Sequence, residues 1–276
     1  MSKNLVVKDN NLINASYNLE LVEQRILLMA VVQSRHLGNS INEFFPVIIH
    51  AQDYADRFNL NINSAYRALR DASKTLFNRK FTYSELSKKG NTVHVENRWV
   101  TQVRYTEMEG EITLMFSPVV IPLITELEKQ FTCYEIEQIA CLSSAHAVRI
   151  YELLMSWKTV LEVQISLEDL KFKLGLEEYS YPRVYDFKKR VLTPSVQQIS
   201  KETDIKVSVQ DIKKGRSVKG FVFKFSFENK SNNNGMSHEK LSIDEWIQKN
   251  NLAHIGESWE EAKKRLKDQY NEYRNQ

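Results

Sequence analysis

Residues Ile49–Leu60 (IHAQDYADRFNL) and Ile165–Leu176 (ISLEDLKFKLGL) align without a gap at a separation of 116 positions. Both stretches begin with apolar residues that are typical of a strand end, and both continue with a short segment that carries acids near its start. Each then closes on a turn residue, which is Asn59 in the first stretch and Gly175 in the second. A basic amphipathic segment follows each turn. The pattern predicts a helix-turn-helix that occurs twice in the chain.

The separation of the two motifs favours duplicated domains, because it is too long for the unit of a solenoid. A chain of 276 residues accommodates two domains of ordinary size. Around each motif the apolar pattern indicates a long helix before it and alternating strands after it. We therefore predict an α+β protein with two tandem winged-helix domains related by internal duplication, and a short helical C-terminal tail. The expected boundaries are 1–130 for the first domain, 131–228 for the second, and 229–276 for a linker and the tail.

The expected elements of the first domain follow from apolar periodicity. A helix is predicted over residues 16–33, where a stripe at helical spacing indicates packing inside the domain, although dimer seams use the same spacing. The residues of this stripe are Leu19, Val22, Ile26 and Met29. Strands are predicted at residues 44–49, 81–86, 92–105 and 111–116. The turn at residues 87–91, which contains Lys88 and Lys89, is interpreted as the wing.

The second domain repeats this order. Its reading helix is expected to begin near Pro182, a residue type favoured at the first helical position. Pro194 lies inside the same helix, where its ring would clash with a regular α-helix, so we expect a kink or a fresh turn there. The wing tip contains Lys213, Lys214 and Arg216. In the tail, Ser258 opens a capping box that predicts a helix to about residue 273, after a linker at residues 231–235.

The second helix of each motif has an apolar face and a face of long hydrogen-bond donors. In the first helix the apolar positions are Ala65, Leu69, Ala72 and Leu76, and the opposite positions are Asn63, Arg67, Arg70 and Lys74. In the second helix the inward positions are Val184, Phe187 and Val191, and the outward ones are Arg183, Asp186, Lys189 and Arg190, with Lys188 on the flank. Such a helix suits the DNA major groove. The alternatives are ordinary solvated faces, and solvated turns in place of the wings.

Positive charge is concentrated in the second domain. The whole chain has a net charge of only +3. Between Arg183 and Lys224, however, eleven Lys or Arg residues stand against four Asp or Glu residues, a local excess of seven. Adjacent cations repel one another unless an anionic partner offsets them, and DNA phosphates do so. The second motif is therefore interpreted as the principal DNA reader and the first as its assistant.

Other function classes lack support in the sequence. Gly215 and Gly220 have P-loop spacing, but Phe221 follows where lysine should stand, and the six histidines include no pair at ligand spacing. We therefore expect no enzymatic activity, metal or cofactor. Cys133 and Cys141 fit no metal or redox motif and are expected to be small apolar core residues in a reducing compartment. With no signal peptide or membrane-length apolar stretch, we expect a cytoplasmic protein without a membrane partner.

The chain resembles the plasmid replication initiators of the iteron-binding, theta-replicating family over roughly residues 5 to 228. The resemblance is carried by Val6–Asn14 with the helix that follows, by AVRIYELLMSW at Ala147–Trp157, and by YDFKKRVLTPSVQQISK at Tyr185–Lys201. It is also carried by TDIK at Thr203–Lys206 and by the paired basic wing. The tail after Asn229 lies outside the resemblance.

The resemblance implies properties that the residues alone do not. Members carry two winged helices that bind repeated origin sequences as monomers, and they form dimers that bind an inverted-repeat operator and repress their own synthesis. They recruit the host initiator and the replicative helicase. By this analogy the second domain would dominate sequence reading, and the first would support it. The alternative is a dedicated repressor with two winged helices and no initiator activity, and a third hypothesis is a nicking enzyme.

Overall fold

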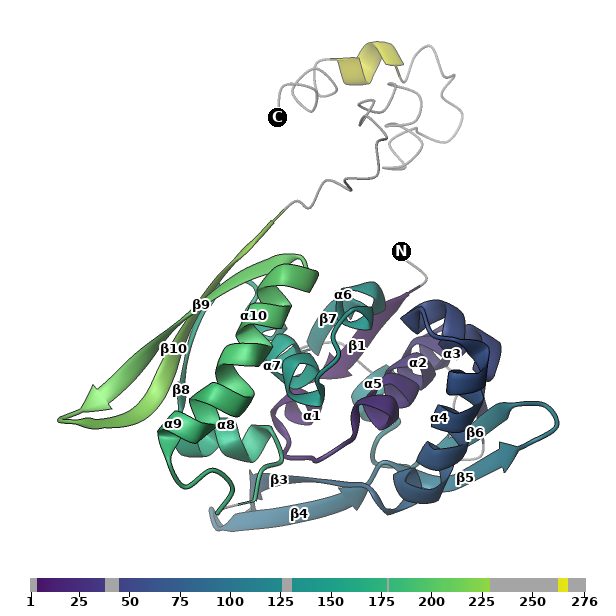
Figure 1. Ribbon diagram of the computed structural model, residues 1–276, viewed down its shortest axis with the longest axis horizontal. Coiled ribbons are helices and arrows are strands. Elements are labelled where there is room, and N and C mark those ends of the chain that lie inside the picture. The colour runs from purple at the N-terminus through teal and green to yellow at the C-terminus, as the bar shows by residue number, and fades with distance from the viewer. Residues whose placement is uncertain (1–3, 38–44, 126–130, 178, 229–262, 268–276) are drawn as a thin grey trace. The chain divides into compact units, whose positions relative to one another are not determined.

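The computed structural model describes residues 4–37, 45–125, 131–177, 179–228 and 263–267. The described residues up to 228 belong to one compact unit (Figure 1), and residues 263–267, which are helical, belong to a second. The predicted linker at 231–235 and the capping box at Ser258 lie outside the described residues. No helix among the described residues combines the length and apolar character needed to cross a membrane.

In the first winged helix, most of the helices precede most of the strands along the chain (Figure 1). Its opening elements are β1 (Leu5–Asp9), α1 (Asn10–Asn14), α2 (Leu21–Leu37), β2 (Val47–His50), α3 (Ala51–Phe58) and α4 (Ile62–Thr75). The strands that follow are β3 (Lys80–Leu86), β4 (Thr92–Arg98), β5 (Val100–Thr106) and β6 (Glu111–Phe116), and α5 (Pro122–Thr125) comes next.

The second winged helix has the same order without one hairpin. Its elements are β7 (Phe131–Glu135), α6 (Ile136–Ala140), α7 (Ala145–Met155), β8 (Glu162–Ser166), α8 (Leu167–Lys173), α9 (Val184–Phe187), a π-helical turn (Lys188–Leu192), α10 (Thr193–Glu202), β9 (Ile205–Lys214) and β10 (Ser217–Phe227). Its sheet, ordered β8-β10-β9, corresponds to the sheet ordered β2-β6-β5 in the first domain. The prediction of two duplicated winged helices is confirmed.

Both helix-turn-helix motifs have the predicted turn chemistry. Asn59 ends α3 with φ 51°, and its backbone N–H donates to the carbonyl of Ala55. Gly175 occupies the same place after α8 with φ +64°. The left-handed region is open to glycine at no steric cost and tolerates asparagine better than most side chains. The two turn residues therefore allow the backbone to reverse its direction at the same position of each motif.

The wing of the first domain is not where the sequence pattern predicted it. Strands β3 and β4 form a separate two-stranded sheet, whereas β5 and β6 join β2. The wing is therefore the β5–β6 hairpin, and Lys88 and Lys89 lie at the turn of the other hairpin. The two hairpins extend in opposite directions from the first domain (Figure 1). Assigning residues 87–91 to the wing was wrong.

The cause of this error is the buried residue Trp99. The predicted strand over residues 92–105 is two strands, because the Trp99 indole, 1% exposed, is inserted into the core between them. The Trp99 backbone N–H donates to the Arg79 carbonyl, and its carbonyl accepts from the Ser117 N–H. The chain thus passes from one sheet to another at Trp99. Alternation alone carries no sign of that change, because both strands continue the same period.

The corresponding segments of the two copies contact each other. Strand β1 pairs antiparallel with β7, with Val7 opposite Cys133. Two arginines also make equivalent contacts, because each donates from its own copy to backbone carbonyls of the other copy. Arg25 of α2 donates to the carbonyls of Ala140 and Leu142 after α6, at 3.1 Å each. Arg149 of α7 donates to the carbonyls that end α1 in the first copy. The two copies thus share a reciprocal interface.

The apolar side chains of both copies form one continuous core. The predicted helical stripe of the first domain belongs to this core, since Leu19, Ile26 and Met29 are all buried and Val22 packs against them. This confirms packing inside the unit over a dimer seam. The two cysteines are free, but Cys141 is exposed and Cys133 only half-buried. Their assignment to the core was therefore wrong.

Candidate nucleic-acid interface

Helix α4 presents the predicted polar face of the first domain. Asn61 caps it, because its side-chain oxygen accepts from the Asn63 N–H at 2.8 Å. The four apolar positions predicted to anchor the helix are at most 4% exposed. The four predicted donor positions are all exposed: Asn63, Arg67, Arg70 and Lys74. The sequence therefore placed both faces of α4 correctly.

A cleft of about 490 Å³ separates α4 from the wing of the first domain. Its helical wall contains Tyr66, Arg67 and Arg70, and Tyr105 from the wing donates from its hydroxyl to the Tyr66 carbonyl at 3.3 Å. Gly110 packs against the Tyr66 ring so closely that a β-carbon would overlap it. The cleft is therefore lined by side chains of both the reading helix and the wing.

The wing tip of the first domain is acidic. Glu107 and Glu109 flank Met108, whose side chain is almost entirely exposed. Carboxylates repel phosphates, and salt screens this repulsion where the charges are exposed. The tip of this wing therefore lacks the cations of the second wing, although Arg104 on β5 is exposed.

The reading helix of the second domain is continuous from Val184 to Glu202. It begins two residues later than predicted, since Pro182 precedes it and Arg183 is its N-cap. Near Pro194 the helix does not break. The backbone N–H of Thr193 instead donates to the Lys188 carbonyl, five residues back, in a π-helical turn. The wider turn requires no N–H from proline and relieves the clash of its ring with the preceding turn.

The π turn changes which residues share a face. Phe187, Val191, Ser195 and Ile199 are all at most 2% exposed, although they are spaced at intervals of four. At 100° per residue a regular helix would rotate the last of these about 120° from the first. The additional residue of the π turn absorbs most of that rotation. The buried face therefore runs parallel to the helix axis.

A straight exposed row follows on the other face. Its members are Tyr185, Lys189, Thr193, Gln197 and Lys201. Four of them, Tyr185, Thr193, Gln197 and Lys201, were not among the predicted site residues. Their interval of four was visible in the sequence. Residues at this interval share one face of the helix only because the helix contains the π turn.

Among the predicted cations of the second domain, Lys188 differs from the others. Its ammonium forms an ion pair with Asp211 of β9 at 2.7 Å and so ties the reading helix to the wing strand. Arg183, Lys189 and Arg190 are exposed, and Arg183 also lies 3.2 Å from Asp186. Of these four predicted cations, three are therefore exposed and the fourth, Lys188, is used in an internal ion pair.

The wing of the second domain is basic and lies where the sequence predicted it. The turn between β9 and β10 consists of Gly215, with φ +62°, and Arg216. Lys213, Lys214 and Arg216 are all exposed, and Lys219 adds a further exposed cation on β10. Lysine and arginine at a hairpin tip are suited to contacts with a phosphate backbone.

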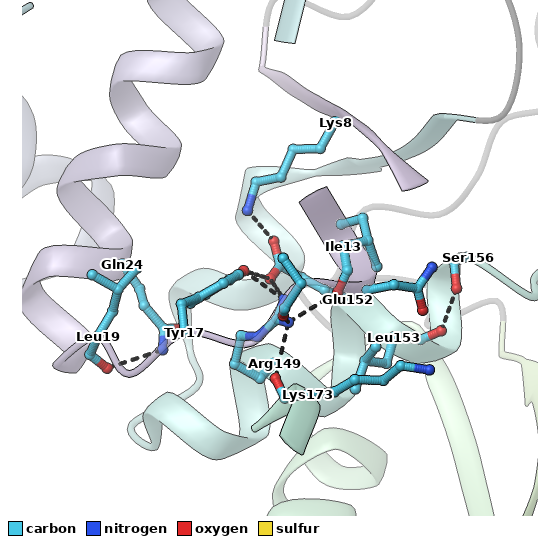
Figure 2. Close-up of polar contacts among 12 residues, drawn as sticks. Lys8, Ile13, Tyr17, Leu19, Gln24, Arg149, Glu152, Leu153, Ser156 and Lys173 are labelled. Carbon is cyan, nitrogen blue, oxygen red and sulfur yellow. Dashed lines mark hydrogen bonds and ion pairs between the residues drawn. The ribbon is translucent and has the colours of Figure 1, made fainter. Parts of the chain in front are cut away.

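A buried polar cluster joins the two domains (Figure 2). The Glu152 carboxylate of α7 lies at its centre. One carboxylate oxygen accepts from the Lys8 ammonium at 2.5 Å and from the Tyr134 hydroxyl, and the other accepts from Arg149 at 2.9 Å and from the Tyr17 hydroxyl at 3.1 Å. Lys8 and Tyr17 come from the first copy and the other three from the second.

The charges of this cluster depend on one another. Burial by itself would raise the pKa of the Glu152 carboxyl, but the Lys8 ammonium and the Arg149 guanidinium more than offset this effect and lower it to about 2. Burial lowers the pKa of Lys8, and the nearby Glu152 carboxylate opposes that shift. At neutral pH the carboxylate is therefore ionised and stabilises both cations.

No group of three or more metal-ligating side chains was found in the part of the chain that the structure describes. The geometry of the described residues offers exposed cations, amides and a cleft.

Two family models match the chain. One, described as "Initiator Replication protein, WH1", covers residues 5–155, and the other, described as "Initiator Rep protein, WH2", covers residues 166–225.

Individual proteins match over most of the same region. An uncharacterized 27.6 kDa protein of Escherichia coli is 23% identical over 76% of this chain and 92% of its own length. The PI protein of Escherichia coli is 26% identical over 64% of this chain and 68% of its own length. The crystal structure of the Pi initiator protein in complex with iteron DNA superposes with a TM-score of 0.69 at 24% identity, over 83% of this chain and 99% of that one.

Proposed function

The chain belongs to the initiator replication protein family, and from this premise we propose that it binds repeated sequences at a plasmid replication origin and promotes opening of the adjacent duplex. Two winged helices that share one core would read two neighbouring segments of a long, asymmetric DNA site. The Pi initiator protein, which has the same fold, was crystallised with iteron DNA.

The observation that supports this proposal most is the distribution of exposed donors over the two reading helices. In the second domain Arg183, Lys189 and Arg190 would contact bases and phosphates, and Lys188 would support them by holding the helix on the wing strand. In the first domain the donors of α4 would assist: Asn63, Arg67, Arg70 and Lys74. Arginine can bond a guanine edge at two positions, which discriminates between bases by about 1–3 kcal/mol.

The remaining predicted cations would position the protein rather than read sequence. Lys213, Lys214 and Arg216 at the tip of the second wing are placed for phosphate contacts. Lys88 and Lys89 lie on the β3–β4 hairpin, which belongs to neither wing sheet, and would add a weaker electrostatic contribution. We also propose that the first domain ends at residue 130 and the second at residue 228.

The proposed mechanism requires no bond cleavage. Copies bound to direct repeats would strain the duplex, and an A·T-rich neighbour would open because its deformation costs least. A monomer would bind the repeats, a dimer would bind an inverted-repeat operator, and the host initiator and replicative helicase would be recruited in the cytoplasm. Incubation with Mg²⁺ and supercoiled DNA that carries the site tests this mechanism, because nicking of the DNA would contradict it.

A dedicated transcriptional repressor is the second candidate, and the symmetry of the preferred site separates the two. An initiator should bind tandem direct repeats as a monomer on each repeat. A repressor should prefer an inverted repeat and bind it only as a dimer. Electrophoretic mobility shifts on both arrangements, with the stoichiometry measured by analytical ultracentrifugation, decide between the two functions.

A further inference from the structure

The turn of the second helix-turn-helix lies directly against the first domain. A β-carbon at Gly175 would overlap the Tyr17 carbonyl and lie 2.7 Å from the Asn18 nitrogen. No side chain therefore fits at this position while the two backbones stay in place. Tyr17 itself precedes α2, the long helix of the first domain. The second reader is thus in backbone contact with the scaffold of the first.

Arg149 fastens the same contact from the interior. Its guanidinium donates to the carbonyls of Ile13 and Ala15, at 2.9 and 3.1 Å, at the C-terminal end of α1 of the first domain. It also donates to the Lys173 carbonyl at 3.1 Å, at the end of α8 in the second domain, and lies 3.8 Å from the centre of the Tyr17 ring (Figure 2). One buried side chain therefore bonds the helix-turn-helix of one domain to the entry segment of the other.

The two contacts act on the separation of the DNA readers. Helix α8 ends at Lys173 and is followed, after Gly175, by the reading helix. A movement of this turn relative to Tyr17 would carry the second reading helix with it, because the helix-turn-helix packs as a unit. On B-DNA, one base pair more between two segments moves them apart by about 3.4 Å and rotates them by about 34°. A movement at the turn therefore alters the same two quantities, separation and rotation, that an inserted or deleted base pair alters.

We propose that the contact of Gly175 and Arg149 with the Tyr17 segment determines the separation and the relative rotation of the two reading helices, so that the protein accepts a single spacing between the two DNA segments it reads. Arg149 and Gly175 are positioning residues that do not touch DNA. The inference rests on the proposed function, since it presupposes that both domains bind one site.

The test measures tolerance to altered spacing. The probe is the tightest duplex that the wild-type full chain selects from a random 40-base-pair library, with the segments covered by each domain mapped by hydroxyl-radical footprinting. Derivatives carry one or two base pairs inserted or deleted between these segments. Affinity for each derivative is measured by fluorescence anisotropy. Wild-type protein should lose about tenfold or more on each derivative, the loss typical of a wrong base pair.

Gly175→Ala is the diagnostic variant, because its added methyl group forces the turn away from Tyr17. Its best spacing should shift by one base pair, or its losses on the derivatives should fall below about threefold. Gly90→Ala is the matched control, since Gly90 also has a positive φ, +80°, but has no atom near its absent β-carbon. It carries the same backbone strain and should keep the wild-type profile.

Arg149→Lys provides an independent variant in case Gly175→Ala does not fold. It keeps a positive charge beside Glu152 but cannot reach three carbonyls at once, so it should broaden the spacing profile in the same way. Identical profiles for wild-type protein and a folded variant would overturn the inference, and so would a wild-type protein that tolerates every spacing. Failure of wild-type protein to select any sequence would instead refute the proposed function.

Discussion

Replacing Glu152 by glutamine should destabilise the folded protein by about 3 kcal/mol at neutral pH. Glutamine keeps the shape of the side chain but removes the negative charge that faces Lys8 and Arg149. The shift of the Glu152 pKa from 4.5 to about 2 corresponds to roughly 3 kcal/mol, since each pKa unit is worth about 1.4 kcal/mol. Removing one member of a buried ion pair typically costs a similar amount, about 3–5 kcal/mol.

The pH dependence of this difference follows from the same pKa. Because the pKa of Glu152 is lower in the folded state than in the unfolded state, its contribution is complete above about pH 4.5 and is lost as the pH falls toward 2. A protonated Glu152 resembles glutamine. The difference in unfolding free energy between wild-type protein and Glu152→Gln should therefore be constant from pH 7 to about pH 5 and shrink in acid.

Urea unfolding, followed by circular dichroism at several pH values, measures this difference. Glu137→Gln is the matched control, because Glu137 also pairs across the domains, with Arg57 at 2.9 Å, but half of its side chain is exposed. That variant should cost less than about 1 kcal/mol. A cost below about 1 kcal/mol for Glu152→Gln at pH 7, or a cost that does not change in acid, would show that the buried charge is not what holds the cluster together.

Three further outcomes are expected. In binding assays on selected and random duplexes, Arg190→Ala should relax sequence preference, whereas Lys214→Ala should weaken binding to all sequences and lower the salt slope by about one; equal losses on every sequence for both would contradict the assigned roles. Lys88→Ala combined with Lys89→Ala should reduce the salt slope by less than the Lys214→Ala change alone, and a larger effect would place that hairpin on DNA. Leu69→Ala should cost about 2–5 kcal/mol in urea unfolding because its side chain is completely buried, and an unchanged midpoint would exclude it from the core.

The positions of the two reading helices could be predicted because they depend on local patterns. Each reading helix has an apolar face at helical spacing, and the helix before it has an acidic first turn and a turn residue that tolerates positive φ. The same applies to the basic wing at Lys213 and Lys214, where the turn lies between two alternating strands. These features needed no knowledge of the rest of the chain.

The features that failed depend on contacts between distant segments. Trp99 divides a segment of uniform alternation into two strands because its ring is buried in the core. Lys188 looked like a free cation, but Asp211 on a strand 23 positions later neutralises it. The row that contains Gln197 emerges only because packing and Pro194 together favour a π turn. The pairing of Lys188 depends on a residue of another element, and the effects of Trp99 and Pro194 depend on how the surrounding core packs against them.

The sequence by itself determined that the chain contains two helix-turn-helix units and that the second is the more basic, because periodicity, turn chemistry and charge are local properties. Only the tertiary structure decided which hairpin is the first wing, which cations are free, and how the two copies are joined. The joint consists of groups from both copies, with Lys8 and Glu152 separated by 144 positions. Burial makes their pairing strong, and burial is a property of the folded chain alone.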